Sequence, residues 1–331
     1  MKTTKERLIK IVDTFSEQRI LVIGDLMLDR YLWCSVERIS PEAPVPIAKI
    51  ENETIAPGGA ANAVNNLCDL GSKVRVVGLV GDDKAGNDLI QYLNQKKVDT
   101  SGIIVDPSRP TTLKTRIMSG HHHMLRLDHE KNIRIEPHHE KELFKRTIAC
   151  LKDIDIFVIS DYAKGLISKE FARKSIDAAR KLGIRVLVDP TPNNILMYQN
   201  SYMIKPNKKE AENITGIKID QTYSNLDKVG NRIIKMLNAK IVIVTLGKDG
   251  MAIFDSQGRS YRIPCIDYRE AVDVSGAGDT TMAALATSLS CGASLRDSVV
   301  LANICAGIAV SKPGTTTCTL KELKNYINKY L

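Results

Sequence analysis

The sequence is poor in features that mark several protein classes. Aromatic residues make up only 5% of the 331 residues, with a single tryptophan, and the seven cysteines include no CxxC pair. An odd, unpatterned set of cysteines indicates free thiols in a reducing compartment. No apolar run approaches the length of a membrane span, and residues 1–20 predict a polar amphipathic helix without an apolar signal core. We therefore expect a cytoplasmic protein with no membrane partner.

Clustered charge is also missing. The formal net charge is +9, yet the lysines are dispersed and no run of five or six like charges occurs. No zinc-finger or aromatic-basic RNA motif accompanies them, so the positive charge indicates a solvated surface and no nucleic-acid partner. The composition, 43% hydrophobic and 26% charged, is ordinary for a globular protein.

Three common ligand motifs are absent or weak. No GxxxxGK(S/T) sequence occurs, which argues against a P-loop. The glycines of GLVGDDKAG lack the GxGxxG spacing of a dinucleotide site directly after the first strand. His121, His122 and His123 suggest a metal site, but adjacent residues of a strand point to opposite faces. We expect these histidines in an exposed loop or lid.

The sequence does contain a regular alternation of strands and helices. The predicted buried strands are 19–25, 73–81, 155–161, 184–190 and 239–247. With helices between them, they predict an α/β fold in which helices cover both faces of a central, mostly parallel sheet. Ligands of such sheets lie at the carboxyl ends of the strands. The polar residues at those ends are Asp25, Asp161, Asp189 and Thr245.

Two β segments interrupt the alternation. Residues 31–56 combine prolines with alternating apolar positions, and residues 109–128 predict a hairpin around Ser119 and Gly120. We expect both to form a small β lid on a single domain of residues 1–331. Because exposed edge strands tend to pair, the lid also suggests a homodimer in which lid edges meet.

The most informative short segment is DVSGAGDTTMAALAT, residues 273–287. Its small residues Gly276, Ala277 and Gly278 lead into Asp279, at the start of a helix. The first amides of a helix have no intrahelical partner, so a glycine-rich turn there suits an anion such as a phosphate. A carboxylate that simply caps the helix after a tight turn is the structural alternative.

These motifs resemble those of the ribokinase, or phosphofructokinase-B, family of sugar kinases. PGGAANAVNNLCDLGSKVRVVGLVGDDKAG, residues 57–86, resembles the amino-terminal signature of the family, and residues 273–287 resemble its carboxyl-terminal signature. NKKE, residues 207–210, resembles the Asn-x-x-Glu element, and TLGKDG, residues 245–250, a nucleotide-contacting strand end. The resemblance covers nearly the whole chain and implies a ribokinase-like fold.

The resemblance implies a phosphoryl-transfer site. It assigns Gly276, Ala277 and Gly278 to an anion hole for the transferring phosphoryl group and Asp279 to the catalytic base. Such a reaction needs positioning and charge stabilisation more than covalent help from the protein. Ser275 stands where relatives usually carry threonine, a conservative departure.

The resemblance also implies ATP and Mg²⁺ as cofactors. Asn207 and Glu210 would hold Mg²⁺ and its waters, and one glutamate suffices because Mg²⁺ keeps many waters. Whether a monovalent cation is needed stays open. The implied nucleotide-binding residues are Asn207, Lys208, Lys209, Glu210, Thr245, Gly247 and Asn303.

The implied substrate is a sugar phosphate. The implied sugar-binding residues are Asp29, Gly58, Gly59 and Asn62. Residues 24–50 and SDYAKG, residues 160–165, look more specifically like kinases that phosphorylate D-glycero-β-D-manno-heptose 7-phosphate at its anomeric hydroxyl, a step toward lipopolysaccharide core or related glycans. No HxGH nucleotidyltransferase motif is present, so we expect a stand-alone kinase. Another sugar kinase of the same family, or a non-catalytic sugar-phosphate-binding regulator, stays open.

A sugar that already carries a phosphate requires cations away from the catalytic centre. The basic candidates for this role are Arg38, Lys114, Arg116, Arg126 and Lys164. Alternate residues of a strand share a face, so Lys114 and Arg116 are predicted to point the same way. Arginine suits phosphate oxygens, although each of these residues taken alone is equally well explained as a solvated charge.

Overall fold

The main sheet contains the strands that the sequence predicts. The computed structural model describes residues 3–120, 122–266 and 272–330, and in these residues nine strands form one sheet in the order β13-β12-β11-β10-β9-β8-β1-β4-β5. They are β1 (Arg19–Gly24), β4 (Lys73–Gly81), β5 (Asp99–Asp106), β8 (Ile156–Ser160), β9 (Arg185–Asp189), β10 (Met203–Ile204), β11 (Ile241–Thr245), β12 (Met251–Asp255) and β13 (Ser260–Ile263). Neighbours from β5 to β11 run parallel, whereas β12 and β13 are antiparallel. The predicted mostly parallel α/β sheet is confirmed.

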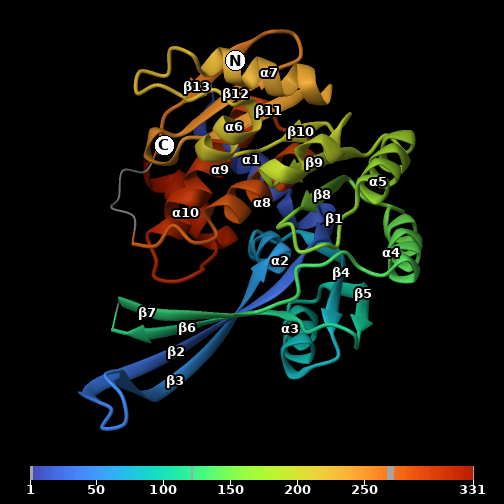
Figure 1. Cartoon of the computed structure of the whole chain (residues 1–331). Helices are drawn as coiled ribbons and strands as arrows, with labels where there is room; N and C mark the ends of the chain where they lie inside the picture. The colour runs from blue at the N-terminus through green and yellow to red at the C-terminus, as the bar shows by residue number, and fades with distance from the viewer. Residues whose placement is uncertain (1–2, 121, 267–271, 331) are drawn as a thin grey trace.

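Helices cover both faces of this sheet (Figure 1). In β1, Ile20 and Val22 join one apolar cluster, whereas Leu21 and Ile23 join the other, as the two-residue period of a strand requires. The helices of the first cluster are α1 (Lys5–Asp13), α2 (Ala60–Asp69), α3 (Lys84–Gln95), α8 (Ala277–Ser290), α9 (Leu295–Val310) and α10 (Leu320–Tyr330). Those of the second are α4 (Pro137–Cys150), α5 (Lys169–Lys181), α6 (Lys208–Thr215) and α7 (Leu226–Leu237).

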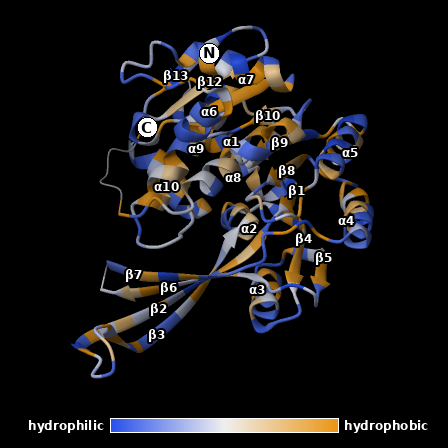
Figure 2. Ribbon diagram, viewed as in Figure 1, coloured by the Kyte–Doolittle hydropathy of each residue, from blue (hydrophilic) through white to orange (hydrophobic). Residues whose placement is uncertain are grey.

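The second sheet projects from the main body as a long β lid (Figure 1). Its described strands are β2 (Leu26–Ile39), β3 (Pro46–Gly59), β6 (Thr112–Ser119) and β7 (His122–His129), in the order β3-β2-β6-β7. β2 pairs antiparallel with β3 and parallel with β6, and β6 and β7 form the predicted hairpin. The strands mix polar and apolar residues, unlike the hydrophobic strands of the main sheet (Figure 2). Because β2 begins at Leu26, Asp29 belongs to the lid.

The structure also bears on the expectations for the cysteines, the histidines and membrane-spanning segments. The buried thiols of Cys34, Cys150, Cys305 and Cys318 form no disulfide in the described ranges. His122 and His123 are exposed on the lid strand β7, as expected, and His121 lies outside the described residues. None of the helices that the structure describes is long and apolar enough to cross a membrane.

Candidate active site

Asp279 lies in the first turn of α8, and its side chain is fixed from two directions. Its Oδ2 accepts a hydrogen bond from Asn62 Nδ2 on α2, and its Oδ1 accepts one from the hydroxyl of Tyr162, which follows β8; both distances are 2.8 Å. The residue is only 5% exposed. Because α8 packs on β1 and β8, this carboxylate lies at the carboxyl ends of the parallel strands.

The surroundings tune the acidity of Asp279. Burial and then the neighbouring charge of Asp189 raise the pKa of Asp279 from 3.8 to about 7, against the hydrogen bonds of Asn62 and Tyr162 and the charge of Lys205, which lower it. A carboxylate whose pKa lies near neutrality can accept a proton from a hydroxyl group and release it again at physiological pH. The chemistry available here is general base catalysis.

The turn before Asp279 leaves room for an anion. Gly276 has φ +79°, and a Cβ atom there would lie 2.6 Å from Asn62 Nδ2, so only glycine fits. The first helical bond of α8 runs from Thr280 N to Gly276 O at 3.0 Å, and the amides of Gly278 and Asp279 have no acceptor within the described chain. In the part of the chain that the structure describes, no side chain caps the helix. The capping alternative therefore fails for Asp279, because its carboxylate is turned toward Asn62 and Tyr162.

A buried ion pair lies beside this turn. Lys205, which directly follows β10, is 2% exposed, and its Nζ lies 2.9 Å from Asp189 Oδ2 at the end of β9. A Cβ atom on Gly278 would lie 3.6 Å from the same Nζ. From the sequence, Asp189 is predicted only as a strand-end acid, and Lys205 is not predicted at all. The sequence feature that could have identified Lys205 is its position directly after a buried strand, at the carboxyl ends of the strands, where ligands of such sheets bind.

Asn207 and Glu210 form a reciprocal capping box at the start of α6. Asn207 N donates to Glu210 Oε2 at 2.7 Å, and Glu210 N donates to Asn207 Oδ1 at 2.9 Å. Burial and then the charge of Asp189 raise the pKa of Glu210, although the hydrogen bond from the Asn207 amide opposes them. The Asn-x-x-Glu element thus has a structural role, and it also brings a carboxylate toward Asp189.

The other predicted nucleotide residues lie at the start of α6, at the carboxyl end of β11 and on α9. Asn207 forms a β-bridge with Thr245, and Gly247 (φ +61°) follows β11 in an open turn. Asn303 on α9 is 4% exposed, and its Nδ2 donates to Pro264 O at 2.8 Å. Lys208 Nζ lies 5.0 Å from the centre of the Tyr223 ring, and Lys209 is exposed. Asn207 and Thr245 are therefore neighbours, whereas the side chain of Asn303 already has an internal partner.

The predicted sugar residues meet where the lid joins the main sheet. A Cβ atom on Gly58 would lie 2.9 Å from Asp29 Oδ2, and one on Gly59 (φ +55°) would lie 2.6 Å from Asp25 O. Both glycines therefore allow the close backbone approach inferred from the sequence. Asn62 lies in the first turn of α2, and its Nδ2 donates to Asp279 Oδ2 at 2.8 Å.

Four of the five basic candidates lie near the base of the lid. Arg116 Nη1 donates to Asp29 Oδ1 at 2.7 Å, and Lys114 Nζ donates to Asp128 at 3.0 Å. Lys114 and Lys164 both donate to Glu130, at 3.4 and 2.7 Å. The remaining candidates are Arg126, which forms two hydrogen bonds to Asp128, and Arg38, which is exposed at the far end of β2.

Arg38 is the residue that the structure does not bring to the site. It lies nine positions beyond Asp29 on the same strand, which corresponds to roughly 30 Å at about 3.3 Å per residue. The sequence does not separate Arg38 from the other cations, because no local pattern shows that β2 runs straight away from the main sheet for its whole length.

The loop after β8 contains the contacts that sequence analysis missed. Asp25, at the end of β1, accepts hydrogen bonds from the amides of Tyr162 (2.8 Å) and Lys164 (3.2 Å). Burial raises the pKa of Asp25 to about 6, because its effect is larger than the opposing effect of these hydrogen bonds. Asp25 thus holds the loop whose Tyr162 reaches Asp279. The signal in the sequence was the tyrosine of SDYAKG beside a strand-end acid.

Comparison with known proteins gives the family. A model described as pfkB family carbohydrate kinase matches residues 17–322. The chain belongs to the pfkB family of carbohydrate kinases. Two curated relatives are both named Bifunctional protein HldE. The one from Desulfatibacillum aliphaticivorans is 39% identical over 313 residues, which is 95% of this chain and 64% of the relative. The one from Helicobacter hepaticus is 41% identical over 310 residues, which is 94% of this chain and 64% of the relative.

Solved pfkB-type structures have the same fold. Phosphofructokinase-2 from Escherichia coli in complex with substrates and products superposes with a TM-score of 0.79 at 20% identity, over 95% of this chain and 99% of that one. Ribokinase from Arabidopsis thaliana complexed with ribose and ATP gives 0.75 at 20% identity, over 94% and 98%. The expected ribokinase-like fold is confirmed.

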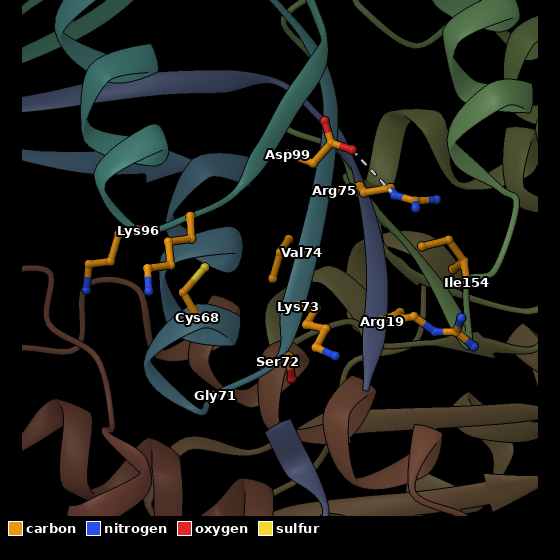
Figure 3. A pocket seen from close by; sticks show the side chains of 11 residues that line it. Arg19, Cys68, Gly71, Ser72, Lys73, Val74, Arg75, Lys96, Asp99 and Ile154 are labelled. Atoms are coloured by element: carbon orange, nitrogen blue, oxygen red, sulfur yellow. Dashed lines mark ion pairs between the residues drawn. The ribbon is translucent and has the colours of Figure 1, made fainter. Parts of the chain in front are cut away.

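A hollow of about 520 Å³ lies at the amino-terminal ends of β1, β4 and β5, away from Asp279 (Figure 3). Its lining residues are Arg19, Cys68, Gly71, Ser72, Lys73, Val74, Arg75, Lys96, Lys97, Asp99 and Ile154. Lys73, Lys96 and Lys97 lie at or just beyond the carboxyl-terminal ends of α2 and α3, where helix dipoles favour cations and disfavour anions. Lys96 also pairs with Asp69 at 2.5 Å. The basic charge of this hollow is therefore explained without a ligand. The candidate site of this pfkB-family chain lies instead at the carboxyl ends of the parallel strands around Asp279, called here the carboxyl edge.

Proposed function

We propose that the chain transfers the γ-phosphoryl group of ATP to the anomeric hydroxyl of D-glycero-β-D-manno-heptose 7-phosphate and yields the 1,7-bisphosphate. The observation that carries the kinase proposal is the buried Asp279 carboxylate beside the amides of Gly278 and Asp279, which have no acceptor among the described residues. Membership of a carbohydrate kinase family supports it. The choice of sugar rests on the resemblance of residues 24–50 and 160–165 to heptose phosphate kinases.

In this proposal Asp279 is the general base. It takes the proton of the anomeric hydroxyl as that oxygen forms its bond to phosphorus and the bond to ADP breaks. The turn of Gly276, Ala277 and Gly278 is proposed to stabilise the transferring phosphoryl group. The donors would be the amides of Gly278 and Asp279, because the amide of Ala277 already donates to Val274 O at 3.3 Å. Lys205, buried next to Gly278, adds positive charge at the same point.

The residues at the nucleotide end fit a magnesium ion. Burial raises the pKa of both Asp189 and Glu210, and the charge of Asp189 adds to the effect on Glu210, so a divalent cation nearby would stabilise both as anions. The described residues contain no cluster of three or more metal-ligating side chains, which suits an ion held by one or two carboxylates, phosphate oxygens and water. Bound there, Mg²⁺ neutralises charge on the phosphates.

The nucleotide is proposed to bind where the start of α6, the carboxyl end of β11 and α9 present the predicted residues. We assign to its binding Asn207, Lys208, Lys209, Glu210, Thr245, Gly247 and Asn303. A monovalent cation is a further proposal, which a comparison of rates in potassium and in sodium salts tests.

The lid would hold the sugar phosphate. Asp29, Gly58, Gly59 and Asn62 are proposed to contact the hydroxyl groups of the sugar. Lys114, Arg116, Arg126 and Lys164 are proposed to supply cations for its phosphate. Arg116, Lys114 and Lys164 are the best placed of these, because all three are partly buried, at 12%, 17% and 19% side-chain exposure.

The lid is also the proposed surface of a homodimer in the cytoplasm. In the described sheet β3 and β7 are edge strands. Apolar side chains are exposed along them, including Ile50 on β3 and Leu125 and Leu127 on β7, at 58%, 54% and 51% exposure. Pairing with a second lid would cover both features. Sedimentation of a Leu125→Glu/Leu127→Glu variant tests this: a monomer at concentrations where the unmodified chain is a dimer supports it, and an unchanged mass contradicts it.

Identification of the product tests the substrate. Purified chain, ATP and Mg²⁺ are incubated with heptose 7-phosphate, unphosphorylated heptose, fructose 6-phosphate and ribose, and the products are identified by mass spectrometry and phosphorus NMR. A 1,7-bisphosphate formed with the highest kcat/KM supports the proposal. Equal kcat/KM for heptose and its 7-phosphate would point to a general sugar kinase. Binding without turnover of any sugar would point to a regulator.

A further inference from the structure

Tyr162 makes the contact with Asp279 that neither the sequence motifs nor the family assignment explain. Its hydroxyl donates to Asp279 Oδ1 at 2.8 Å, and the two residues are 117 positions apart in the chain. Burial, followed by the charge of Asp279, raises the pKa of Tyr162 well above its ordinary value. The phenol therefore keeps its proton, and remains a donor, throughout the pH range in which Asp279 titrates.

We propose that Tyr162 is a positioning residue for the catalytic base: its hydroxyl, together with the amide of Asn62, holds the two oxygens of Asp279 so that the carboxylate meets the sugar hydroxyl in one orientation and in its ionised form. The inference rests on the proposed role of Asp279 as general base. Each carboxylate oxygen has two lone pairs. Both oxygens can therefore accept a structural hydrogen bond and still leave a lone pair for the substrate proton.

The loop that carries Tyr162 is fixed on both sides. Asp25 accepts the amide of Tyr162 at 2.8 Å, and Asp161 Oδ1 accepts the amide of Ala163 at 2.8 Å. Ala163 has φ +55°, a left-handed conformation that is unfavourable for a residue with a side chain. The other oxygen of Asp161 accepts hydrogen bonds from Thr191, Asn194 and Tyr198. Strain of this kind persists only where surrounding contacts impose it, so the direction of the tyrosine is preset.

The charges around Tyr162 and Asp279 come from three other elements. Asp189 at the end of β9 and Asp29 on β2 are negative, and Lys205 after β10 is positive. Asp189 opposes ionisation of Asp279, and Lys205 favours it. The hydrogen bond from Tyr162 also favours the ionised form, so its removal should raise the pKa of Asp279 further.

The test is Tyr162→Phe, which keeps the ring and removes the hydroxyl. We expect the acid limb of kcat/KM against pH to move upward by about one pH unit, which lowers the rate on that limb about tenfold. KM for ATP should stay within about twofold. The matched control is Tyr198→Phe, which removes a tyrosine–carboxylate hydrogen bond to Asp161 at 2.7 Å. Because Tyr198 acts on Asp279 only through the Tyr162 loop, the acid limb of this variant should move much less than that of Tyr162→Phe.

A second variant tests the opposite direction without shortening the side chain. A ring-fluorinated tyrosine at position 162 is a stronger donor, so its acid limb should move to lower pH. If neither variant moves the limb, or if Tyr198→Phe moves it equally, the proposal is wrong.

The Asp279→Asn variant separates this inference from the proposed function. If Asp279→Asn keeps near-normal turnover, Asp279 is not the base, and both ideas fail. If it loses turnover while the Tyr162 variants leave the acid limb unmoved, only the positioning role of Tyr162 is refuted.

Discussion

Replacing Asp279 with asparagine should stabilise the fold while it removes activity. The pKa of Asp279 is raised from 3.8 to about 7 in the folded chain, mainly by burial. A difference of one in pKa corresponds to about 1.4 kcal/mol. The ionised carboxylate therefore destabilises the folded chain by about 4 kcal/mol above pH 7, compared with a neutral side chain of the same shape.

The pH dependence of this effect follows from the sign of the pKa change. The folded pKa lies above the unfolded value, so the folded chain binds the proton more tightly. The destabilisation is absent below pH 3.8, grows as the pH rises, and is complete above pH 7. We expect the gain in unfolding free energy of Asp279→Asn to be about 3 kcal/mol larger at pH 8 than at pH 5.

Urea unfolding followed by circular dichroism measures these gains at both pH values. Asp297→Asn is the matched control, because Asp297 is also a buried acid in the first turn of a helix but forms an ion pair with Arg7 at 2.6 Å. That variant should lose stability at both pH values. Turnover of Asp279→Asn should fall by about 10² to 10⁴. An equal gain at pH 5 and pH 8, or a loss at pH 8, would refute the reasoning.

Three further predictions concern the nucleotide, the sugar phosphate and the turn. Glu210→Gln should raise the Mg²⁺ concentration that gives half-maximal rate, whereas unchanged Mg²⁺ dependence would leave Glu210 only its capping role. Arg116→Met should raise KM for the sugar phosphate by about 10- to 100-fold and leave KM for ATP nearly unchanged; an equal rise in both would contradict a substrate-specific role. Gly276→Ala should lower turnover at least about tenfold, because its Cβ would meet Asn62 at 2.6 Å. Gly120→Ala is its control, since that glycine has a similar positive φ but nothing within 4 Å, and its kinetics should not change.

The sequence predicts this fold well because its signals are local. Alternating strands and helices, buried runs such as 19–25 and 239–247, and a glycine-rich turn at a helix start are all short-range patterns, and the structure contains them where expected. Gly276 and Asp279 could be singled out because a turn without side chains before an acid is visible in four residues.

The contacts of the candidate site are less predictable because they join distant segments. Asp279 meets Asn62 across 217 positions and Tyr162 across 117. No periodicity in the sequence carries that information. The same limit applies to Arg38, which lies at the far end of β2, because the composition of a strand does not say which of its ends meets the sheet. Lys205 was missed for a related reason: whether a lysine after a strand is buried depends on the acid that the neighbouring strand supplies.

The buried acids of the carboxyl edge share one physical property, a pKa that burial raises. Burial raises the pKa of Asp25, Asp189, Glu210 and Asp279 together, so the folded chain holds several carboxylates in an environment that disfavours their charge. A fold selected for stability alone would replace them with neutral residues. Lys205 is the cation that lowers the pKa of Asp189, Glu210 and Asp279. Under the proposed function, a divalent cation that accompanies ATP would add positive charge near Asp189 and Glu210. Its binding should therefore lower the pKa of these carboxylates and raise the unfolding free energy of the chain.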